Sequence, residues 1–276
     1  MSKFPIALQL YSVRDDMEKD FEGTLKKVAD LGYDGVEFAG LFGREPAEVR
    51  RLCEELGLTP VSTHVPYQEL IVDPAETVRY YKQLGVDYIV IPYLTEDLRP
   101  GQPGFDGVIT GAAVIGAECA AENLVLLYHN HDFEFVKIDG QYALDVLYGS
   151  IPADLLQTEI DTCWANVGGV DPSGYIVKYS DRSPVIHLKD FVMPGKKPAR
   201  MYALIGIDDT NDQSSGEAAF EFRPIGYGVQ DIEAIIEASR KAGARWLIVE
   251  QDMPSMGRTP MECAAMSIDF LKKVNL

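Results

Sequence analysis

Basic residues are scarce in this sequence. Its 276 residues include 25 lysines and arginines against 43 aspartates and glutamates, which gives a formal net charge of −18. No basic run is longer than two residues, as at Lys196-Lys197. Such an acidic surface repels phosphate backbones and anionic membranes, so the sequence argues against nucleic-acid and membrane partners. A small neutral or metal-chelated substrate is easier to accommodate.

Cysteines and long apolar runs are also lacking. The four cysteines are far apart and form no C-x-x-C pair, so neither a disulfide framework nor a cysteine zinc site is expected. Buried free thiols fit a reducing, cytosolic setting. No stretch approaches the length of a membrane span, and no signal-peptide core follows Met1. We therefore expect a soluble, cytoplasmic protein, and a homo-oligomer is compatible with the sequence.

A repeated pattern of helix, glycine and strand organises the chain. Leu31-Gly32, Leu56-Gly57, Leu84-Gly85 and Ala242-Gly243 each join an amphipathic segment to a β-branched one, and Asn123 stands at the equivalent point of a fifth unit. Glycine and asparagine tolerate the left-handed conformation that ends a helix. A helix followed by a strand that is apolar on both faces is typical of a parallel α/β sheet.

Eight strands of this kind are expected, at residues 6–11, 33–38, 59–64, 88–92, 124–128, 155–161, 184–189 and 246–250. The intervening segments include predicted helices at 141–148 and 260–274. Residues 191–222 do not fit the repeat, and we interpret them as an elaborated loop after strand seven that contains a small hairpin.

These features predict a single (β/α)8 barrel over residues 1–276, with no linker or break in composition. A doubly wound sheet is the alternative architecture. It would require a glycine-rich phosphate turn after strand one, where this chain has Gln9-Leu-Tyr-Ser12 instead.

All four histidines lie near the ends of the expected strands. His129 and His131 follow the apolar run that ends at Tyr128, while His64 and His187 lie in two other β-branched runs. Ligands bind outside the carboxyl ends of parallel strands, so we expect the histidines to share one site. For any one of them alone, a hydrogen-bonded core histidine is the more common role.

The expected strand ends carry a set of residues suited to metal and proton chemistry: Gln9, Tyr11, Glu37, His64, Tyr93, His129, His131, Asp161, His187, Lys189 and Glu250. Asp161, His187 and Glu250 come from three adjacent strands, and their side chains suit Mn, Co, Zn or Mg. His129 or His131 offers a fourth ligand. Capping of a loop is the alternative role for Asp161, and Glu159 is expected deeper on the same face.

Several short motifs, in this order, resemble those of one family. They are Gly32-x-Asp34-x-Val36-Glu37, Ser62-x-His64, Asp161-Thr162, His187-x-Lys189-Asp190, Pro224-x-Gly226-x-Gly228 and Val249-Glu250. Together they resemble the xylose isomerase-like barrel superfamily of sugar phosphate isomerases and epimerases. Tyr128-His-Asn-His131 is more similar to its inosose-dehydratase-like branch, whose members include lyases acting on keto sugars.

The resemblance implies one divalent metal ion held by Asp161, His187 and Glu250. The family's first ligand is a glutamate near the end of strand five, where this chain has His129, and Glu134 offers a carboxylate from the following loop. We therefore expect a metal-dependent isomerase or epimerase that forms an enediolate on a polyhydroxylated carbonyl compound. Alternatives are a keto-sugar lyase or dehydratase of the inosose-dehydratase type and a barrel that binds sugar without catalysis.

The expected roles can be assigned to particular residues. Glu250, His131 or Glu134 would exchange the proton. The expected substrate-binding residues are Gln9, Tyr11, Glu37, His64, Trp164 and Lys189. A trinuclear zinc phosphodiesterase, which shares the barrel, needs more histidines than this chain has and a basic groove.

Overall fold

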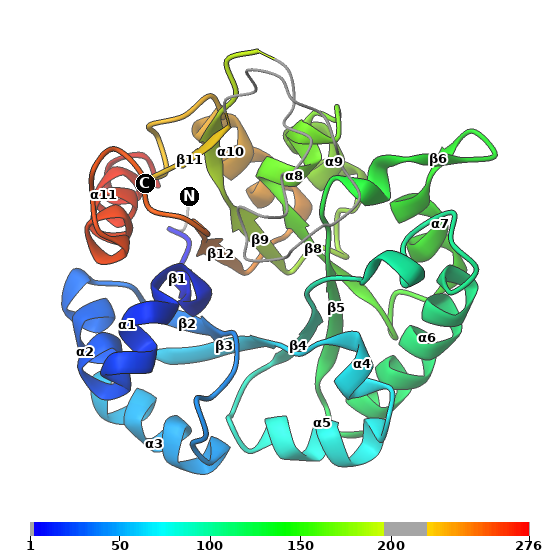
Figure 1. The fold of residues 1–276 in the computed structure, drawn as a ribbon, viewed down its shortest axis with the longest axis horizontal. Helices are drawn as coiled ribbons and strands as arrows, with labels where there is room; N and C mark the ends of the chain where they lie inside the picture. The colour runs from blue at the N-terminus through cyan, green and yellow to red at the C-terminus, as the bar shows by residue number, and fades with distance from the viewer. Residues whose placement is uncertain (1–2, 196–219, 276) are drawn as a thin grey trace.

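Eight parallel strands close into a barrel (Figure 1). The computed structural model describes residues 3–195 and 220–275. In order around the barrel the strands are β1 (Ile6–Gln9), β12 (Trp246–Val249), β9 (Val185–Leu188), β8 (Gln157–Asp161), β5 (Val125–His129), β4 (Tyr88–Ile91), β3 (Thr59–His64) and β2 (Gly35–Phe38). Strand β1 pairs with both β2 and β12, which closes the ring. The predicted (β/α)8 barrel is confirmed.

Helices form the outer layer of the barrel in Figure 1: α2 (Phe21–Leu31), α3 (Pro46–Leu56), α5 (Pro74–Lys82), α6 (Phe105–Ala121), α7 (Ala143–Ser150), α9 (Pro172–Lys178), α10 (Ile232–Ala242) and α11 (Pro260–Val274). Gly32, Gly57 and Gly243 adopt the predicted left-handed caps, with φ of 87°, 70° and 79°. Within the described residues, no helix is long and apolar enough to cross a membrane.

The barrel interior has an apolar layer with a polar layer above it. Ala7, Val61, Tyr88, Val90, Leu127, Val185 and Ile248 pack together inside the strands. Because side chains alternate along a strand, the residue two positions further on shares the same inward face. Leu127 is thus followed by His129, Val185 by His187 and Ile248 by Glu250. The strand register therefore places the candidate site residues at the carboxyl mouth.

The end of β1 and the start of the helix expected at 141–148 differ from the predicted bounds. Strand β1 stops at Gln9, and Tyr11 lies in a 3-10 turn, η1 (Leu10–Val13), because the Gln9 side chain accepts the N–H of Tyr11 and caps that turn. Gln141 and Tyr142 are not helical but form β7 (Gln141–Tyr142), paired with β6 (Lys137–Ile138). Between them Asp139 and Gly140 have φ of 49° and 86°, the conformation of a two-residue hairpin turn.

The segment after β9 contains the predicted hairpin. Strand β10 (Asp190–Val192) pairs antiparallel with β11 (Glu221–Arg223). The intervening residues 196–219, including Lys196 and Lys197, lie outside the described residues. The buried Asp190 carboxylate accepts the N–H groups of four residues: Phe191, Gly226, Gly228 and Gln230. It thereby joins the hairpin to the loop that follows it.

Helix α6 provides a test of the close packing behind β5. A Cβ atom added at Gly116 would lie 2.0 Å from the carbonyl oxygen of Leu155. We expect Gly116→Ala to destabilise the protein by about 2 kcal/mol or more, because backbone must move. Gly107, on the same helix, has no neighbouring atom within 4 Å of such a Cβ. Gly107→Ala should stabilise it by about 0.5 kcal/mol. Urea unfolding of both variants measures the change in their free energies of unfolding. Equal changes in the two variants would contradict the prediction.

Candidate functional site at the barrel mouth

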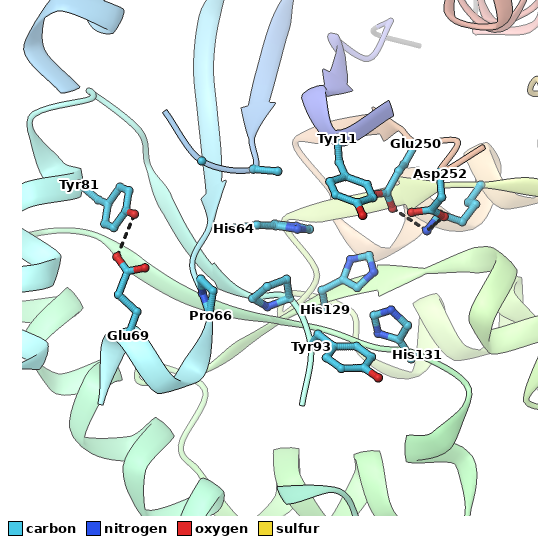
Figure 2. A pocket seen from close by; sticks show the side chains of 14 residues that line it. Tyr11, His64, Pro66, Glu69, Tyr81, Tyr93, His129, His131, Glu250 and Asp252 are labelled. Atoms are coloured by element: carbon cyan, nitrogen blue, oxygen red, sulfur yellow. Dashed lines mark hydrogen bonds and ion pairs between the residues drawn. The ribbon is translucent and has the colours of Figure 1, made fainter. Parts of the chain in front are cut away.

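A pocket of about 450 Å³ opens at the carboxyl ends of the strands (Figure 2). Its lining residues are Tyr11, Ala39, Gly40, His64, Pro66, Glu69, Tyr81, Pro92, Tyr93, His129, His131, Lys189, Glu250 and Asp252. Glu69 and Tyr81, which share a hydrogen bond of 2.9 Å, lie at one end of the view, and His131, Glu250 and Asp252 lie at the other. The histidines and two of the three acidic side chains that line the pocket are therefore away from the Glu69–Tyr81 pair.

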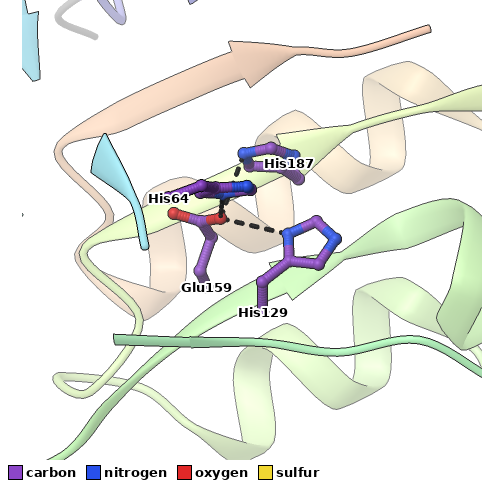
Figure 3. Close-up of side chains that lie close together, drawn as sticks. All are labelled: His64, His129, Glu159 and His187. Atoms are coloured by element: carbon purple, nitrogen blue, oxygen red, sulfur yellow. Dashed lines mark hydrogen bonds and ion pairs between the residues drawn. The ribbon is translucent and has the colours of Figure 1, made fainter. Parts of the chain in front are cut away.

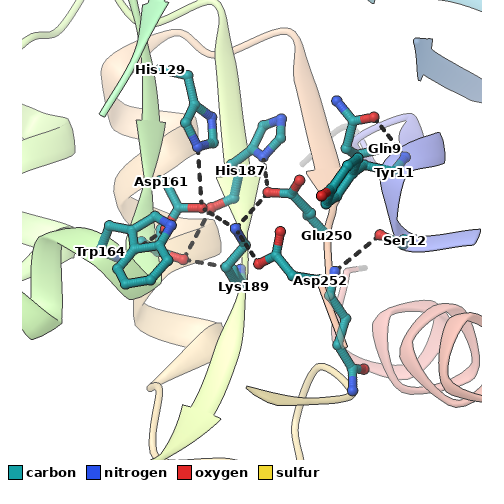
Figure 4. Close-up of polar contacts among 12 residues, drawn as sticks. Gln9, Tyr11, Ser12, His129, Asp161, Trp164, His187, Lys189, Glu250 and Asp252 are labelled. Carbon is teal, nitrogen blue, oxygen red and sulfur yellow. Dashed lines mark hydrogen bonds and ion pairs between the residues drawn. The ribbon is translucent and has the colours of Figure 1, made fainter. Parts of the chain in front are cut away.

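The structure brings together the four predicted metal ligands. One donor atom from each of His129, Asp161, His187 and Glu250 lies within 4.8 Å of the others. All four residues are buried, and they come from β5, β8, β9 and the position just after β12 (Figure 4). His129 Nε2 is 3.7 Å from Asp161 Oδ2, and His187 Nδ1 is 3.3 Å from Glu250 Oε2. We call these four residues the quartet.

Asp161 uses its two carboxylate oxygens differently. Oδ1 accepts the N–H of Trp164 at 2.8 Å and caps helix α8 (Thr162–Val167), so the capping role considered from the sequence is present. Oδ2 is buried and has no hydrogen-bond partner, although Lys189 Nζ lies 3.4 Å away. A buried anionic oxygen without a hydrogen bond is costly, so Oδ2 is the atom of this residue best suited to a cation.

Two deeper carboxylates orient the histidines of the quartet. Glu159 Oε1 lies 3.0 Å from Nδ1 of His129, and Glu37 Oε1 lies 2.6 Å from Nε2 of His187. With these nitrogens occupied by hydrogen bonds, the opposite nitrogens, Nε2 of His129 and Nδ1 of His187, face the other ligands. Carboxylates placed behind histidines in this way set the tautomer and the ring direction in metal sites.

A second compact group contains His64, His129, Glu159 and His187 (Figure 3). Nitrogens of the three histidines lie 2.9, 3.0 and 3.1 Å from Glu159 Oε1. These are ordinary hydrogen-bond lengths, so this group is best described as the support beneath the quartet. It confirms the expectation that Glu159 lies deeper than Asp161.

Gln9 and Glu37 also belong to this support. Both are fully buried, and neither lines the pocket. Glu37 accepts hydrogen bonds from Gln9 Nε2 at 2.7 Å and from Ser62 Oγ at 2.5 Å. The structure therefore places these two expected substrate-binding residues below the pocket, where they hold the histidines.

The buried histidines differ in charge. Burial, followed by the positive charges of His187 and His64, holds the pKa of His129 well below its ordinary value. Burial also lowers the pKa of His64, but Glu37 and Glu159 outweigh it and raise that pKa to about 10. The same two carboxylates hold the pKa of His187 well above its usual range despite burial. His129 is thus a neutral imidazole, the form that binds metals.

Lys189 and Asp252 complete the polar layer. The Nζ atom of Lys189 lies 2.6 Å from Glu250 Oε2 and 2.9 Å from Asp252 Oδ2. Asp252 was not among the sequence-predicted residues. The sequence does indicate Asp252, because this residue follows Glu250 by two positions and side chains two positions apart in an extended chain lie on the same face.

His131 and Trp164 lie beside the quartet. His131 lines the pocket, and its ring packs against Tyr93, Phe133 and Trp164 at centroid distances of 5.0, 5.6 and 5.2 Å. Burial, and then the charge of Lys189, hold the pKa of His131 well below its usual range. Trp164 is fully buried and does not line the pocket.

Glu134 does not reach the pocket. Its carboxylate is fully buried and accepts the hydroxyl of Tyr128 at 2.6 Å and the backbone N–H of His131 at 2.8 Å. The structure therefore places this expected proton-exchanging residue behind His131. Burial raises its pKa to about 7.

The residues at the mouth fit one divalent cation. Once the bound ion displaces the proton of His187, two imidazole nitrogens and two carboxylate oxygens are a donor set for Zn, Mn or Co, and binding there would satisfy Asp161 Oδ2. Carboxyl groups also outnumber cations in the polar layer. The five carboxyl groups of Glu37, Glu159, Asp161, Glu250 and Asp252 lie beside three cations, the buried His187 and Lys189 and the partly buried His64. Additional positive charge would be stabilised there.

The fold and this layer define a class of protein, a (β/α)8 barrel with a histidine and carboxylate site at its carboxyl mouth. Residues 25–274 match the model of the xylose isomerase-like TIM barrel family. The chain belongs to this family.

Particular relatives are distant but cover most of the chain. A curated protein of Clostridium beijerinckii named inosose dehydratase is 21% identical, over 94% of this chain and 93% of its own length. A sugar phosphate isomerase/epimerase structure from Parabacteroides distasonis aligns with a TM-score of 0.74 and 21% identity, over 98% of each chain. A family member from Mycobacterium smegmatis, solved in complex with magnesium, aligns with a TM-score of 0.70 and 14% identity, over 100% of this chain and 98% of its own.

Glu134 generates a prediction about pH. Because its pKa is about 7 in the folded protein, above the ordinary 4.5, its contribution to stability is complete below pH 4.5 and is lost as the pH rises through 7. Glu134→Gln cannot ionise, so relative to the wild type it should gain up to about 3 kcal/mol between pH 4.5 and pH 8.

Chemical denaturation of both proteins across this pH range measures the difference. Glu55→Gln, on the exposed face of α3, controls for the loss of one acidic charge. A stability difference between Glu134→Gln and the wild type that stays constant with pH would contradict the prediction.

Proposed function

We propose that this protein is a metal-dependent enzyme that moves a proton at the carbon next to a carbonyl group in a polyhydroxylated substrate, such as a sugar or keto-polyol. The observation that carries this proposal is the quartet, with buried carboxylates behind both of its histidines. Membership of the xylose isomerase-like family supports an enzyme of carbohydrate chemistry.

A divalent ion held by the quartet, whether Mn, Co, Zn or Mg, would supply positive charge to the carbonyl and a neighbouring hydroxyl oxygen, which favours formation of an enediolate. The protein's own groups then move the protons. His131 is a neutral imidazole on the pocket wall and can accept the proton from carbon. Glu250 faces it across the pocket, beside Tyr11 and Asp252 (Figure 2).

Elimination of water is the outcome that we favour. Loss of a hydroxyl group as water requires a proton on the departing oxygen. His131 carries one after the first step, and the Lys189 ammonium in the same pocket can donate a hydrogen bond to that oxygen. The end of β5 carries imidazoles where the family's usual glutamate stands, so a symmetric pair of carboxylate bases is not available. Curated relatives named inosose dehydratase support a dehydratase acting on a keto-polyol.

Isomerisation or epimerisation is the second candidate. It requires the proton to be returned to carbon, and His131 and Glu250 provide basic groups on two sides of the pocket. Structural neighbours named sugar phosphate isomerase/epimerase and L-ribulose 3-epimerase support it. Both reactions share the first proton transfer and differ in the fate of the enediolate.

The shared step and the product can be separated by experiment. Incubation with Mn²⁺ and a panel of keto-polyols and keto sugars in D₂O should give deuterium at the carbon next to the carbonyl. Mass spectrometry then distinguishes loss of water from a product of unchanged composition. A protein that remains fully active after removal of its metal ions would rule out this proposal.

Substitution of the quartet should abolish the reaction. We expect Asp161→Asn and Glu250→Gln each to weaken metal binding and activity by about 100-fold or more, because each removes an anionic ligand. Calorimetric titration with Mn²⁺ and turnover assays measure the two effects. Glu55→Gln, far from the pocket on α3, is the control, and quartet variants with unchanged metal affinity would contradict the assignment.

A further inference from the structure

Lys189 occupies a position between three buried carboxylates. Its Nζ atom is 2.6 Å from Glu250 Oε2, 2.9 Å from Asp252 Oδ2 and 3.4 Å from Asp161 Oδ2. The side chain is 2% exposed, and the ring of Trp164 lies 5.4 Å from Nζ. The ammonium group thus neutralises oxygens that would otherwise repel one another in a region of low dielectric constant.

Two of these three carboxylates belong to the quartet. Asp161 Oδ2 and Glu250 Oε2 face Lys189 Nζ on one side and the nitrogens of His129 and His187 on the other. A divalent ion bound by the quartet would use the same oxygens. Lysine and metal therefore compete for them, since a dication and an ammonium group close to the same oxygens repel each other.

Asp252 lies outside the quartet, and hydrogen bonds to the backbone at residues 251 and 252 hold it in place. Its carbonyl oxygen accepts a hydrogen bond of 2.7 Å from Arg14, and the N–H of Gln251 is bonded to Ser12 Oγ at 3.0 Å. Helix α1 (Arg14–Lys19) and turn η1 thus hold the backbone on which Asp252 stands. Its carboxylate remains available to Lys189 whatever the other two carboxylates bind.

We propose that Lys189 is an internal cation that holds the acidic site together before metal binds, and that Asp252 receives its ammonium group when a divalent ion takes Asp161 and Glu250. Both are positioning residues with respect to the metal. The inference rests on the metal site of the proposed function and adds an exchange of cations to it.

Substitution of Lys189 should change metal-free stability and metal affinity in opposite directions. Without metal, Lys189→Met leaves three buried carboxylates without their common partner, so its melting temperature should fall by about 10 °C. With the competing cation removed, Mn²⁺ should bind about tenfold more tightly than to the wild type. Addition of Mn²⁺ should therefore raise the melting temperature of this variant more than that of the wild type.

Asp252 provides the complementary test. In Asp252→Asn the lysine retains only the two quartet carboxylates as charged partners, so Mn²⁺ should bind about tenfold more weakly. Asp252→Glu, which restores the charge, should recover most of the affinity. Lys178→Met is the matched control, because Lys178 pairs with Asp145 at 2.6 Å on the exposed surface, and it should leave Mn²⁺ affinity unchanged.

Calorimetric titration with Mn²⁺ and thermal unfolding with and without it separate the outcomes. A wild-type protein that binds no divalent ion would contradict the proposed function, and the metal-free melting temperature of Lys189→Met would still test the internal cation. A wild type that binds Mn²⁺ while Lys189→Met binds it equally or more weakly would overturn the inference. If Lys189→Met does not fold even with Mn²⁺, the Mn²⁺ affinity of Asp252→Asn is the deciding measurement. An affinity equal to that of the wild type would overturn the inference.

Discussion

Hydrogen bonds between buried carboxylates and histidines hold the mouth of this barrel in order. Glu159 contacts His129, and Glu37 contacts His187, each through one ring nitrogen. This leaves the opposite nitrogens facing Asp161 and Glu250. Without these bonds the imidazoles would be free to rotate, and the quartet would lose its common centre. The proposed metal site therefore depends on Glu37 and Glu159, which do not line the pocket.

The parallel barrel makes such a layer possible. Inward-facing side chains recur at every second residue, so β5, β9 and β12 each contribute an apolar group to the interior and a polar group above it. Burial of so many ionisable groups is costly unless they are paired. Here the pairing is extensive, with His64, His187 and Lys189 distributed among the carboxylates. The remaining excess of carboxyl groups makes the same layer attractive to a divalent cation.

Local chemistry explains which parts of the fold were predictable. Glycine caps and the capping box at Thr259 set helix boundaries through interactions within a few residues, and α11 and β3 have the predicted limits. The prediction was less accurate where a side chain competed with the regular pattern. Gln9 ended β1 by capping a turn, and the Asp139-Gly140 hairpin turn placed Gln141 and Tyr142 in a strand where a helix start was predicted.

The sequence by itself determined the barrel and the convergence of Asp161, His187 and Glu250 with a histidine of strand five, His129 or His131, because strand periodicity and chain direction specify which residues reach the mouth. The structure selects His129. Only the tertiary structure decided which atoms face one another. Gln9, Glu37 and Glu134 were expected to act on substrate or proton but are turned to other partners, and Asp252 joined Lys189. The physical reason is that side-chain direction depends on contacts between strands distant in sequence, which periodicity does not encode.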